Sequence, residues 1–164
     1  MGRKLSLLFL LLGCGLMLPT LASANADRLV VKKSARKMFL FEGDKLLRSY
    51  QIALGKNPVG HKERQGDYRT PEGRYLLDWR NPQSRFYRSI HISYPNESDR
   101  RRAAAKGVHP GANIMIHGVP DRYRDDQEFI ISLNWTEGCI AVTNDDMNEI
   151  WALVAENTPI EIIP

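Results

Sequence analysis

The chain is poor in cysteine: only Cys14 and Cys139 occur among its 164 residues. Cys14 lies in an N-terminal apolar run that we expect to be removed, which would leave a single thiol. One cysteine excludes an intramolecular disulfide. It leaves a choice between a small buried hydrophobic side chain and a reactive group, so the residues around Cys139 have to decide between these roles.

The sequence also lacks the close-spaced ligand pairs that are typical of zinc sites, because neither C-x-x-C nor H-x-x-x-H occurs. We therefore expect no metal and no other cofactor. A metal site built from Cys139 and the histidines stays a rival hypothesis, and so does a non-catalytic binding module with an inert, buried cysteine. Internal repeats and low-complexity linkers are absent, which favours one domain. The 43% of hydrophobic residues and 26% of charged residues are ordinary for a folded protein.

No long apolar run occurs except at the N-terminus, where Arg3 and Lys4 precede the stretch from Leu5 to Leu18. The small residues Ala22 to Ala26 follow. A charged start, a short apolar stretch and an A-x-A-like end are typical of a secretory signal, and the run is too short for a stable membrane span. We expect residues 1–26 to be a signal peptide, cleaved after Ala24 or Ala26, and residues 27–164 to be an exported domain in the periplasm or cell envelope.

An alternative reading of the same segment is a lipoprotein box, Leu11-Leu12-Gly13-Cys14, with Cys14 as the lipid anchor. We rank it second, because the apolar sequence and a good A-x-A site both continue beyond Cys14.

Basic residues are missing from the whole C-terminal part, since Arg124 is the last one, although the formal net charge is +4. The first part is correspondingly basic, with Arg100 to Arg102 as its densest run. Such asymmetry can indicate nucleic-acid binding, but export makes nucleic acid an implausible partner. An anionic cell-wall polymer suits the charge better, although the arginine triplet alone is equally well explained as a solvated helix face.

The hydrophobic pattern predicts a mainly β domain, either sandwich-like or a mixed sheet, with a few short helices. The expected strands are 29–31, 37–42, 45–54, 74–80, 89–93, 114–116, 139–142 and 160–163, with a turn at Gly43-Asp44 and a long loop over 55–73. A short helix is expected over 97–106 and a helical or irregular stretch over 125–134. Thr143 with Asp146 is typical of a helix start, and Met147, Ile150, Trp151 and Val154 form its apolar stripe.

Two short motifs carry the candidate chemistry. In Thr136-Glu137-Gly138-Cys139, the glycine before the thiol allows close backbone approach, so that main-chain N–H groups can converge on an oxyanion. A thiol needs a base or a cation to become a nucleophile, and His117 is the best placed histidine because it ends an apolar strand. For His61, His91 and His109 we expect structural roles. The carboxylate of Glu137 should raise the pKa of Cys139, so another group must act against it.

These motifs resemble the catalytic signature of the L,D-transpeptidases (the YkuD-type domain), which has a histidine–glycine pair followed downstream by Ser/Thr-His-Gly-Cys. The stretch 114–118 matches the first part, and 136–140 matches the second. Thr70-Pro71-Glu72-Gly73 resembles the family's Thr-Pro-x-Gly, and the stretches 92–96 and 135–151 resemble a cell-wall branch. The resemblance covers nearly all of residues 27–164. It implies the L,D-transpeptidase catalytic fold.

The resemblance implies that Cys139 attacks the carbonyl of the diamino-acid–D-alanine bond in a peptidoglycan tetrapeptide stem, with His117 handling protons. A thioester acyl-enzyme would then pass to an amine. Gly138 and Cys139 would supply oxyanion-hole N–H groups, the Gly118 carbonyl would orient His117, and Thr136 and Asn144 would support the site. The candidates for holding a substrate carboxylate are Arg80, Arg85 and Arg88, and Tyr94 is a further substrate-binding candidate.

The sequence leaves the fate of the acyl group open. A carboxypeptidase or endopeptidase with the same Cys139 and His117 would hydrolyse stems or release a wall-attached protein, whereas a transpeptidase would cross-link stems or attach such a protein. Two departures from the family pattern bear on this choice: Glu137 replaces the usual histidine, and Ala141 stands where many members have arginine.

Overall fold

The structure, a computed structural model, describes residues 25–164. The predicted signal peptide, except Asn25 and Ala26, and the lipoprotein alternative at Cys14 lie outside these residues. The described part contains the strands β1 (Arg28–Lys32), β2 (Lys37–Glu42), β3 (Lys45–Gln51), β4 (Gly73–Ser84), β5 (Tyr87–Ile92), β6 (Met115–His117), β7 (Ile140–Ala141) and β8 (Thr158–Ile163). Its helices are α1 (Glu97–Ala105), the 3-10 helix η1 (Asp121–Asp126), α2 (Gln127–Ser132) and α3 (Asn144–Leu153).

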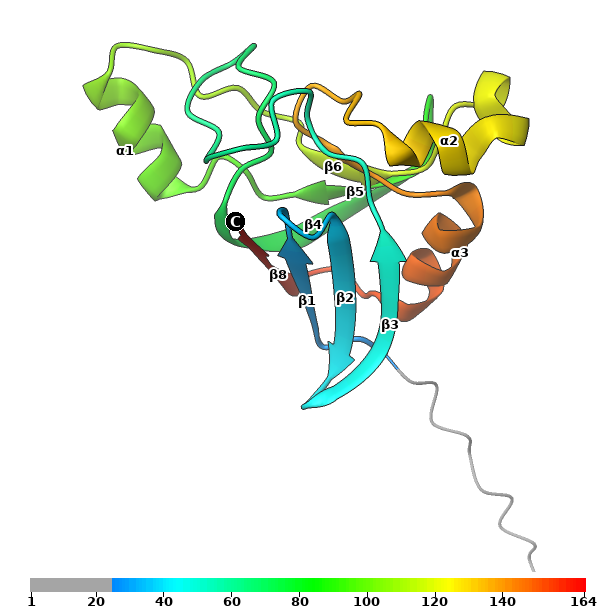
Figure 1. Ribbon diagram of the computed structural model, residues 1–164. Helices are drawn as coiled ribbons and strands as arrows, with labels where there is room; N and C mark the ends of the chain where they lie inside the picture. Colours follow the sequence, from blue (N-terminus) through cyan, green and yellow to red (C-terminus); the bar gives the residue numbers. More distant parts are fainter. Residues whose placement is uncertain (1–24) are drawn as a thin grey trace, which may run out of the picture.

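The strands form one curled, mixed sheet in the order β3-β2-β1-β8-β4-β5-β6-β7. Most neighbours are antiparallel, but β1 pairs with β8 and β6 pairs with β7 in parallel. In Figure 1, α1 lies on the opposite side of the molecule from α2 and α3. The predicted mainly β class is confirmed, in its mixed-sheet form.

The chain beyond β3 returns to the far edge of the sheet. Ala53 exchanges two backbone hydrogen bonds of 2.9 Å with Ala141 of β7, and Gly55 forms a parallel bridge with Thr136. The chain from β3 to Gly55 therefore begins at one edge of the sheet and pairs with the other edge. Its pairing with Thr136 and Ala141 fixes both sides of the turn that carries Cys139.

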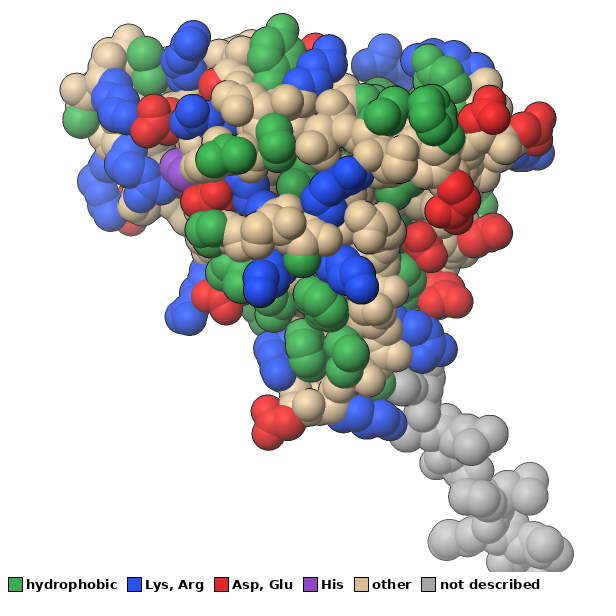
Figure 2. All heavy atoms as spheres, in the orientation of Figure 1, with side chains coloured by type: hydrophobic (Ala, Val, Ile, Leu, Met, Phe, Trp, Pro, Cys, Tyr) green, Lys and Arg blue, Asp and Glu red, His purple; other side chains and the backbone are tan. Residues whose placement is uncertain are grey.

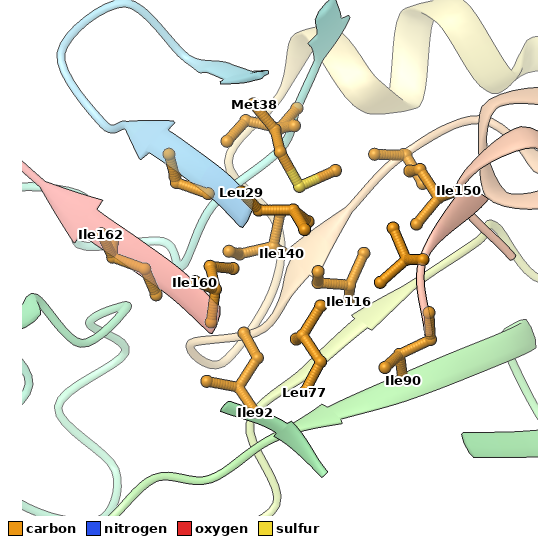
Figure 3. Packing of buried hydrophobic residues seen from close by; sticks show 14 of the residues in the cluster. Leu29, Met38, Leu77, Ile90, Ile92, Ile116, Ile140, Ile150, Ile160 and Ile162 are labelled. Carbon is orange, nitrogen blue, oxygen red and sulfur yellow. The ribbon is translucent and has the colours of Figure 1, made fainter. Parts of the chain in front are cut away.

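The main core lies on the concave side of the sheet, between the strands and α3 (Figure 3). Alternate residues of the strands point into this core. In β8 these are Ile160 and Ile162, which are buried, and Leu29 of β1 lies beside them. Helix α3 adds Met147 and Ile150 from the stripe that the sequence predicted.

The start of α3 behaves as the sequence predicts, and the start of α1 has a capping box that the sequence analysis did not single out. Thr143 caps α3, and its Oγ1 accepts the Asp146 N–H at 3.2 Å. Asn96 and Asp99 form a capping box at the start of α1. Trp151 differs from its prediction, because it is only half-buried at the edge of the core.

Several strand ends differ from the predicted ranges, in both directions. β4 runs to Ser84 and β5 starts at Tyr87, so both are longer at the hairpin between them than the hydrophobic pattern indicated. Their extra residues are mostly polar and partly exposed, which hides them from a pattern based on burial. β8 is also longer and starts at Thr158, whereas β3 is shorter and ends at Gln51, and β7 is limited to Ile140–Ala141.

The charge asymmetry of the sequence is visible on the surface. Figure 2 shows basic side chains gathered over the α1 side and acidic side chains over the side of α2 and α3. Among residues 25–164, no helix is both long and apolar enough to cross a membrane.

Candidate active site

Cys139 ends a turn that a single threonine holds in shape. Thr136 Oγ1 accepts the N–H of Gly138 at 3.1 Å and donates to the carbonyl of Cys139 at 2.7 Å. Gly138 has φ +133°, and a Cβ there would lie 2.6 Å from the Arg69 carbonyl oxygen. Only glycine fits, because the loop at residues 55–73 packs directly against the turn.

The threonine of the Thr-Pro-x-Gly stretch fastens that loop. Thr70 is fully buried, and its Oγ1 accepts the N–H of Gly55 at 3.1 Å. Its carbonyl accepts the buried ammonium of Lys33 at 2.9 Å. The loop and the β3 extension are thereby joined behind the Cys139 turn.

His117 ends β6, beside β7. Ile116 pairs with Ile140, and both are buried in the main core. Side chains alternate along strands, so His117 and Cys139 both project from the opposite face of the same two strands. The structure thus brings the two residues that the sequence singled out to one side of one sheet.

Aromatic rings cover His117, which is only 3% exposed. The Phe86 ring lies 4.6 Å from the imidazole centroid, and the Trp135 ring meets it edge-on at 5.6 Å. Phe86 occupies the tip of the β4–β5 hairpin, beyond the predicted strands. Because the two rings exclude water, burial lowers the pKa of His117 from 6.5 to about 4, against the opposing backbone contact with Gly118.

The neutral imidazole is oriented by the next residue, as the resemblance implied. His117 Nδ1 lies 2.7 Å from the carbonyl oxygen of Gly118. An Nδ1–H donating to this oxygen leaves Nε2 as the free base.

Asn144 braces the same corner from the start of α3. Its Oδ1 accepts the Val119 N–H at 2.7 Å, and a Cβ on Gly118 would approach that oxygen to 2.4 Å. Gly118 therefore has no room for a side chain. Asn144 touches the backbone beside His117 and is placed to support it.

The Cys139 thiol is half-buried, with its Sγ 3.7 Å from the carbonyl oxygen of Asn113. Burial raises the pKa of Cys139. A backbone contact from Met115 and the positive charge of Lys62 lower this pKa, whereas Glu137 raises it in the expected direction. Lys62 is thus a group that acts against Glu137.

Lys62 is held in place by a buried carboxylate. Its ammonium lies 2.8 Å from Asp67 Oδ1, and Asp67 also accepts the backbone N–H groups of Glu63, Arg64 and Arg69. Burial alone would raise the pKa of Asp67, but these hydrogen bonds outweigh it and lower the pKa to about 2. Asp67 is therefore ionised at neutral pH and fixes the loop segment that lines the site.

Cys139 and His117 line one cleft of about 680 Å³. Its walls carry four cationic side chains and one carboxylate, Glu137. The cations are Lys56, Lys62, Arg85 and Arg122. Since they come from three separate segments, the loop over 55–73, the β4–β5 hairpin and η1, no local pattern in the sequence marks them as a group. Their excess over acidic groups suits a ligand with several carboxylates.

Of the four residues that the sequence analysis proposed for substrate binding, only one lines the cleft. Arg85 lines the cleft, but the guanidinium of Arg80 lies over the Trp151 ring, 3.9 Å from its centroid. Arg88 stacks on the same ring at 5.4 Å. Tyr94 is 2% exposed and donates its hydroxyl to the Pro110 carbonyl at 2.9 Å, so it has a structural place outside the cleft.

The other histidines have partners of their own. His61 contacts Asp99 at 3.2 Å and accepts the Glu72 N–H, and His91 contacts Asp78 at 2.6 Å. His109 accepts the Gly111 N–H at 3.1 Å on the cleft wall. Within residues 25–164, no three His, Cys, Asp or Glu side chains are arranged to hold a metal ion.

Ala141, where many members of the family have arginine, is fully buried. It packs with Ala53, Val119 and Ile131 in a second small core under α2. The segment η1–α2, which lies between His117 and Cys139 in the sequence, covers Ala141.

Comparison with known proteins agrees with this geometry. A protein of Escherichia coli (strain K12) named "Putative L,D-transpeptidase YafK" is 37% identical over 112 residues, which are 66% of this chain and 37% of that protein. The chain thus spans well under half the length of this curated relative.

Solved structures share the fold. A point mutant of the helical cell shape determining protein Pgp2 from Campylobacter jejuni matches with a TM-score of 0.63 and 25% identity, over 85% of this chain and 47% of that one. An L,D-transpeptidase from Mycobacterium smegmatis matches with a TM-score of 0.55 over 84% of this chain and 58% of that one. At 13% identity, this second match concerns the fold alone. The L,D-transpeptidase catalytic domain family (YkuD) matches residues 26–162, and the chain belongs to that family.

Proposed function

We propose that this protein is an exported L,D-transpeptidase of the bacterial cell envelope, with Cys139 as nucleophile and His117 as base. Its donor substrate is the tetrapeptide stem of peptidoglycan. The observation that carries the proposal is the placement of the two side chains on one face of neighbouring parallel strands, at the floor of a cationic cleft. The stem is rich in carboxylates, which the cleft complements.

Acylation begins when Nε2 of His117 takes the thiol proton. Cys139 Sγ then attacks the carbonyl of the diamino-acid–D-alanine bond, and the tetrahedral intermediate collapses to a thioester. The amine of D-alanine leaves with the proton that His117 holds. Burial lowers the pKa of His117 to about 4, so the imidazole is neutral at neutral pH and the lone pair of Nε2 is available. The same shift makes the imidazole a weak base, so proton transfer from the thiol has to be coupled to the attack on the bound substrate.

Deacylation reverses the proton path. An acceptor amine attacks the thioester, His117 takes a proton from it, and the thiolate regains that proton. A side-chain amine of a second stem would give a cross-link. Water in the same position would give hydrolysis, and a wall-attached protein is a further acceptor or substrate.

Of the two N–H groups expected in the oxyanion hole, those of Gly138 and Cys139, we retain only one. The Gly138 N–H already donates to Thr136 Oγ1, so we assign the oxyanion to the Cys139 N–H. Thr136 then acts by holding the turn in shape. Of Arg80, Arg85 and Arg88, only Arg85 lines the cleft, which supports it as the partner of a substrate carboxylate.

Product analysis by mass spectrometry tests the proposal. Purified protein and Cys139→Ala are incubated side by side with tetrapeptide-bearing wall fragments. Dimers joined through two diamino acids indicate transfer, free tripeptides indicate hydrolysis, and Cys139→Ala should yield neither. Full activity in Cys139→Ala would overturn the mechanism, and loss of activity on exhaustive chelation would favour the metal hypothesis.

A further inference from the structure

Outside the cleft, three side chains of β4 and β5 form a compact group in which Trp79 is exposed and Asp78 and His91 are half-buried. His91 Nδ1 lies 2.6 Å from Asp78 Oδ1, and the Trp79 ring stacks on the imidazole at 5.0 Å with an interplanar angle of 17°. The sheet register shifts between Leu77 and Trp79. Such a bulge sets two residues of one strand against one of its partner, so Asp78 and Trp79 can both reach His91.

This group faces the same side as the active site. Trp79 pairs with His91, and His91 pairs with Met115 of β6. The parallel register of Ile116 with Ile140 places Met115 beside Cys139, and a backbone contact joins those two residues. Paired residues project from one face of a sheet, so Trp79, His91, Met115 and Cys139 form a row across it.

We propose that Trp79, with Asp78 and His91, is a saccharide-binding platform that holds the glycan strand next to the stem being processed. The proposal rests on the proposed function, since it takes the glycan of the same polymer as ligand. Trp79 is 41% exposed, although half of a large aromatic ring in water is unfavourable without a partner. An aromatic ring packs against the C–H face of a pyranose, and a carboxylate accepts hydroxyl hydrogen bonds.

The polar neighbours fit this use. One oxygen of Asp78 takes the contact with His91, and the carboxylate has a second oxygen for a sugar hydroxyl. His91 stiffens the platform by stacking beneath the indole, which lowers the entropy lost on binding.

The spacing also fits. Trp79 and Cys139 lie three strand spacings apart, which is roughly 14 Å at about 4.8 Å for each. A stem is attached to its sugar at one end, and its third residue carries the attacked carbonyl. Three extended residues span about 10 Å, so the sugar ring falls near the indole when the carbonyl is at Cys139.

Binding is tested without catalysis. Wild-type protein is titrated with peptide-free oligomers of N-acetylglucosamine, and the three indole N–H signals are followed by NMR, with Trp79→Phe assigning one of them. The Trp79 signal should shift in a saturable manner while those of Trp135 and Trp151 stay in place. If no indole signal shifts, or only the others do, the platform is wrong, whatever the enzyme does.

Kinetics provide the second test. Trp79→Ala should lower kcat/KM about tenfold for stems linked to their disaccharide, a change worth about 1.4 kcal/mol, and leave free stem peptides unchanged. Phe129→Ala is the control, because it removes an exposed aromatic ring from α2. Equal effects of Trp79→Ala on both substrates would overturn the proposal. Failure of the proposed function would instead appear as full activity in Cys139→Ala.

Discussion

His117 Nδ1 and the carbonyl oxygen of Gly118 lie 2.7 Å apart, and this contact ties the imidazole to the backbone at the end of its own strand. It favours one tautomer in a site where the aromatic rings of Phe86 and Trp135 disfavour the charged form. The imidazole therefore combines fixed orientation with a low pKa, and that combination can be measured.

The pH dependence of the free energy of unfolding should reflect the burial of the His117 imidazole. Between its ordinary pKa of 6.5 and its folded value of about 4, the unfolded chain binds a proton that the folded chain does not. The free energy of unfolding should therefore fall as the pH falls through this window, by at most about 1.4 kcal/mol per pH unit. Urea unfolding at a series of pH values should give a flatter dependence for His117→Gln, and identical slopes would contradict the assignment.

The thiol should respond to its two charged neighbours with opposite signs. Lys62→Met should raise the pKa of Cys139 and slow its alkylation at neutral pH, whereas Glu137→Gln should lower the pKa and speed it. Rates with iodoacetamide across pH provide the measurement. Lys45→Met, at an exposed position that starts β3, should change neither, and shifts of the same sign in both test variants would sink the idea.

The Cys139 turn should tolerate no side chain at Gly138. Gly138→Ala combines a positive φ with a contact of 2.6 Å to a backbone oxygen, so it should destabilise the fold by about 3 kcal/mol or more. Gly43→Ala is the matched control in the β2–β3 turn, where φ is also positive but the space is open, and should cost only about 1 kcal/mol. Similar unfolding midpoints for the two variants would show that close packing at the turn is unimportant.

The two cleavage sites predicted for the signal should give products of different stability. Ala26 is buried, and its N–H donates to the Leu153 carbonyl at 2.8 Å. Protein that starts at Asn25 keeps this hydrogen bond, whereas protein that starts at Asp27 lacks it and should unfold at a lower urea concentration. Equal unfolding midpoints of the two purified forms would contradict this prediction.

Local patterns predicted that the strands exist, though not all of their ends, and they singled out the two residues that the structure places on one face of neighbouring strands. A short apolar strand ending in His117, a glycine before Cys139 and the Thr143 cap each lie within a few neighbouring residues, where sequence periodicity is informative. The order of strands and the parallel pairing of β6 with β7 depend on contacts between distant segments, which one sequence does not reveal.

The wall of the site was mostly hidden for the same reason. Phe86 and Trp135 cover His117, but they lie on separate loops, and although Trp135 starts the family-like stretch 135–151, nothing in the sequence joins it to Phe86 or to His117. Among the arginines, only packing separates Arg85 at the cleft from Arg80, whose aromatic partner is in α3. In the sequence, Arg80, Arg85 and Arg88 are equivalent because each offers only its positive charge.

The pairing of Ala53 with Ala141 has a consequence for how the site comes into existence. Residues from the first third of the chain complete the edge that positions the thiol, and this contact spans most of the folded sequence. Closing such a long loop costs conformational entropy before the contact repays it, so pairings of this kind are slow to form. The turn that carries Cys139 is therefore braced by a contact with a distant part of the chain, and a substitution that weakens the segment after β3 should disturb this turn although it is remote in sequence.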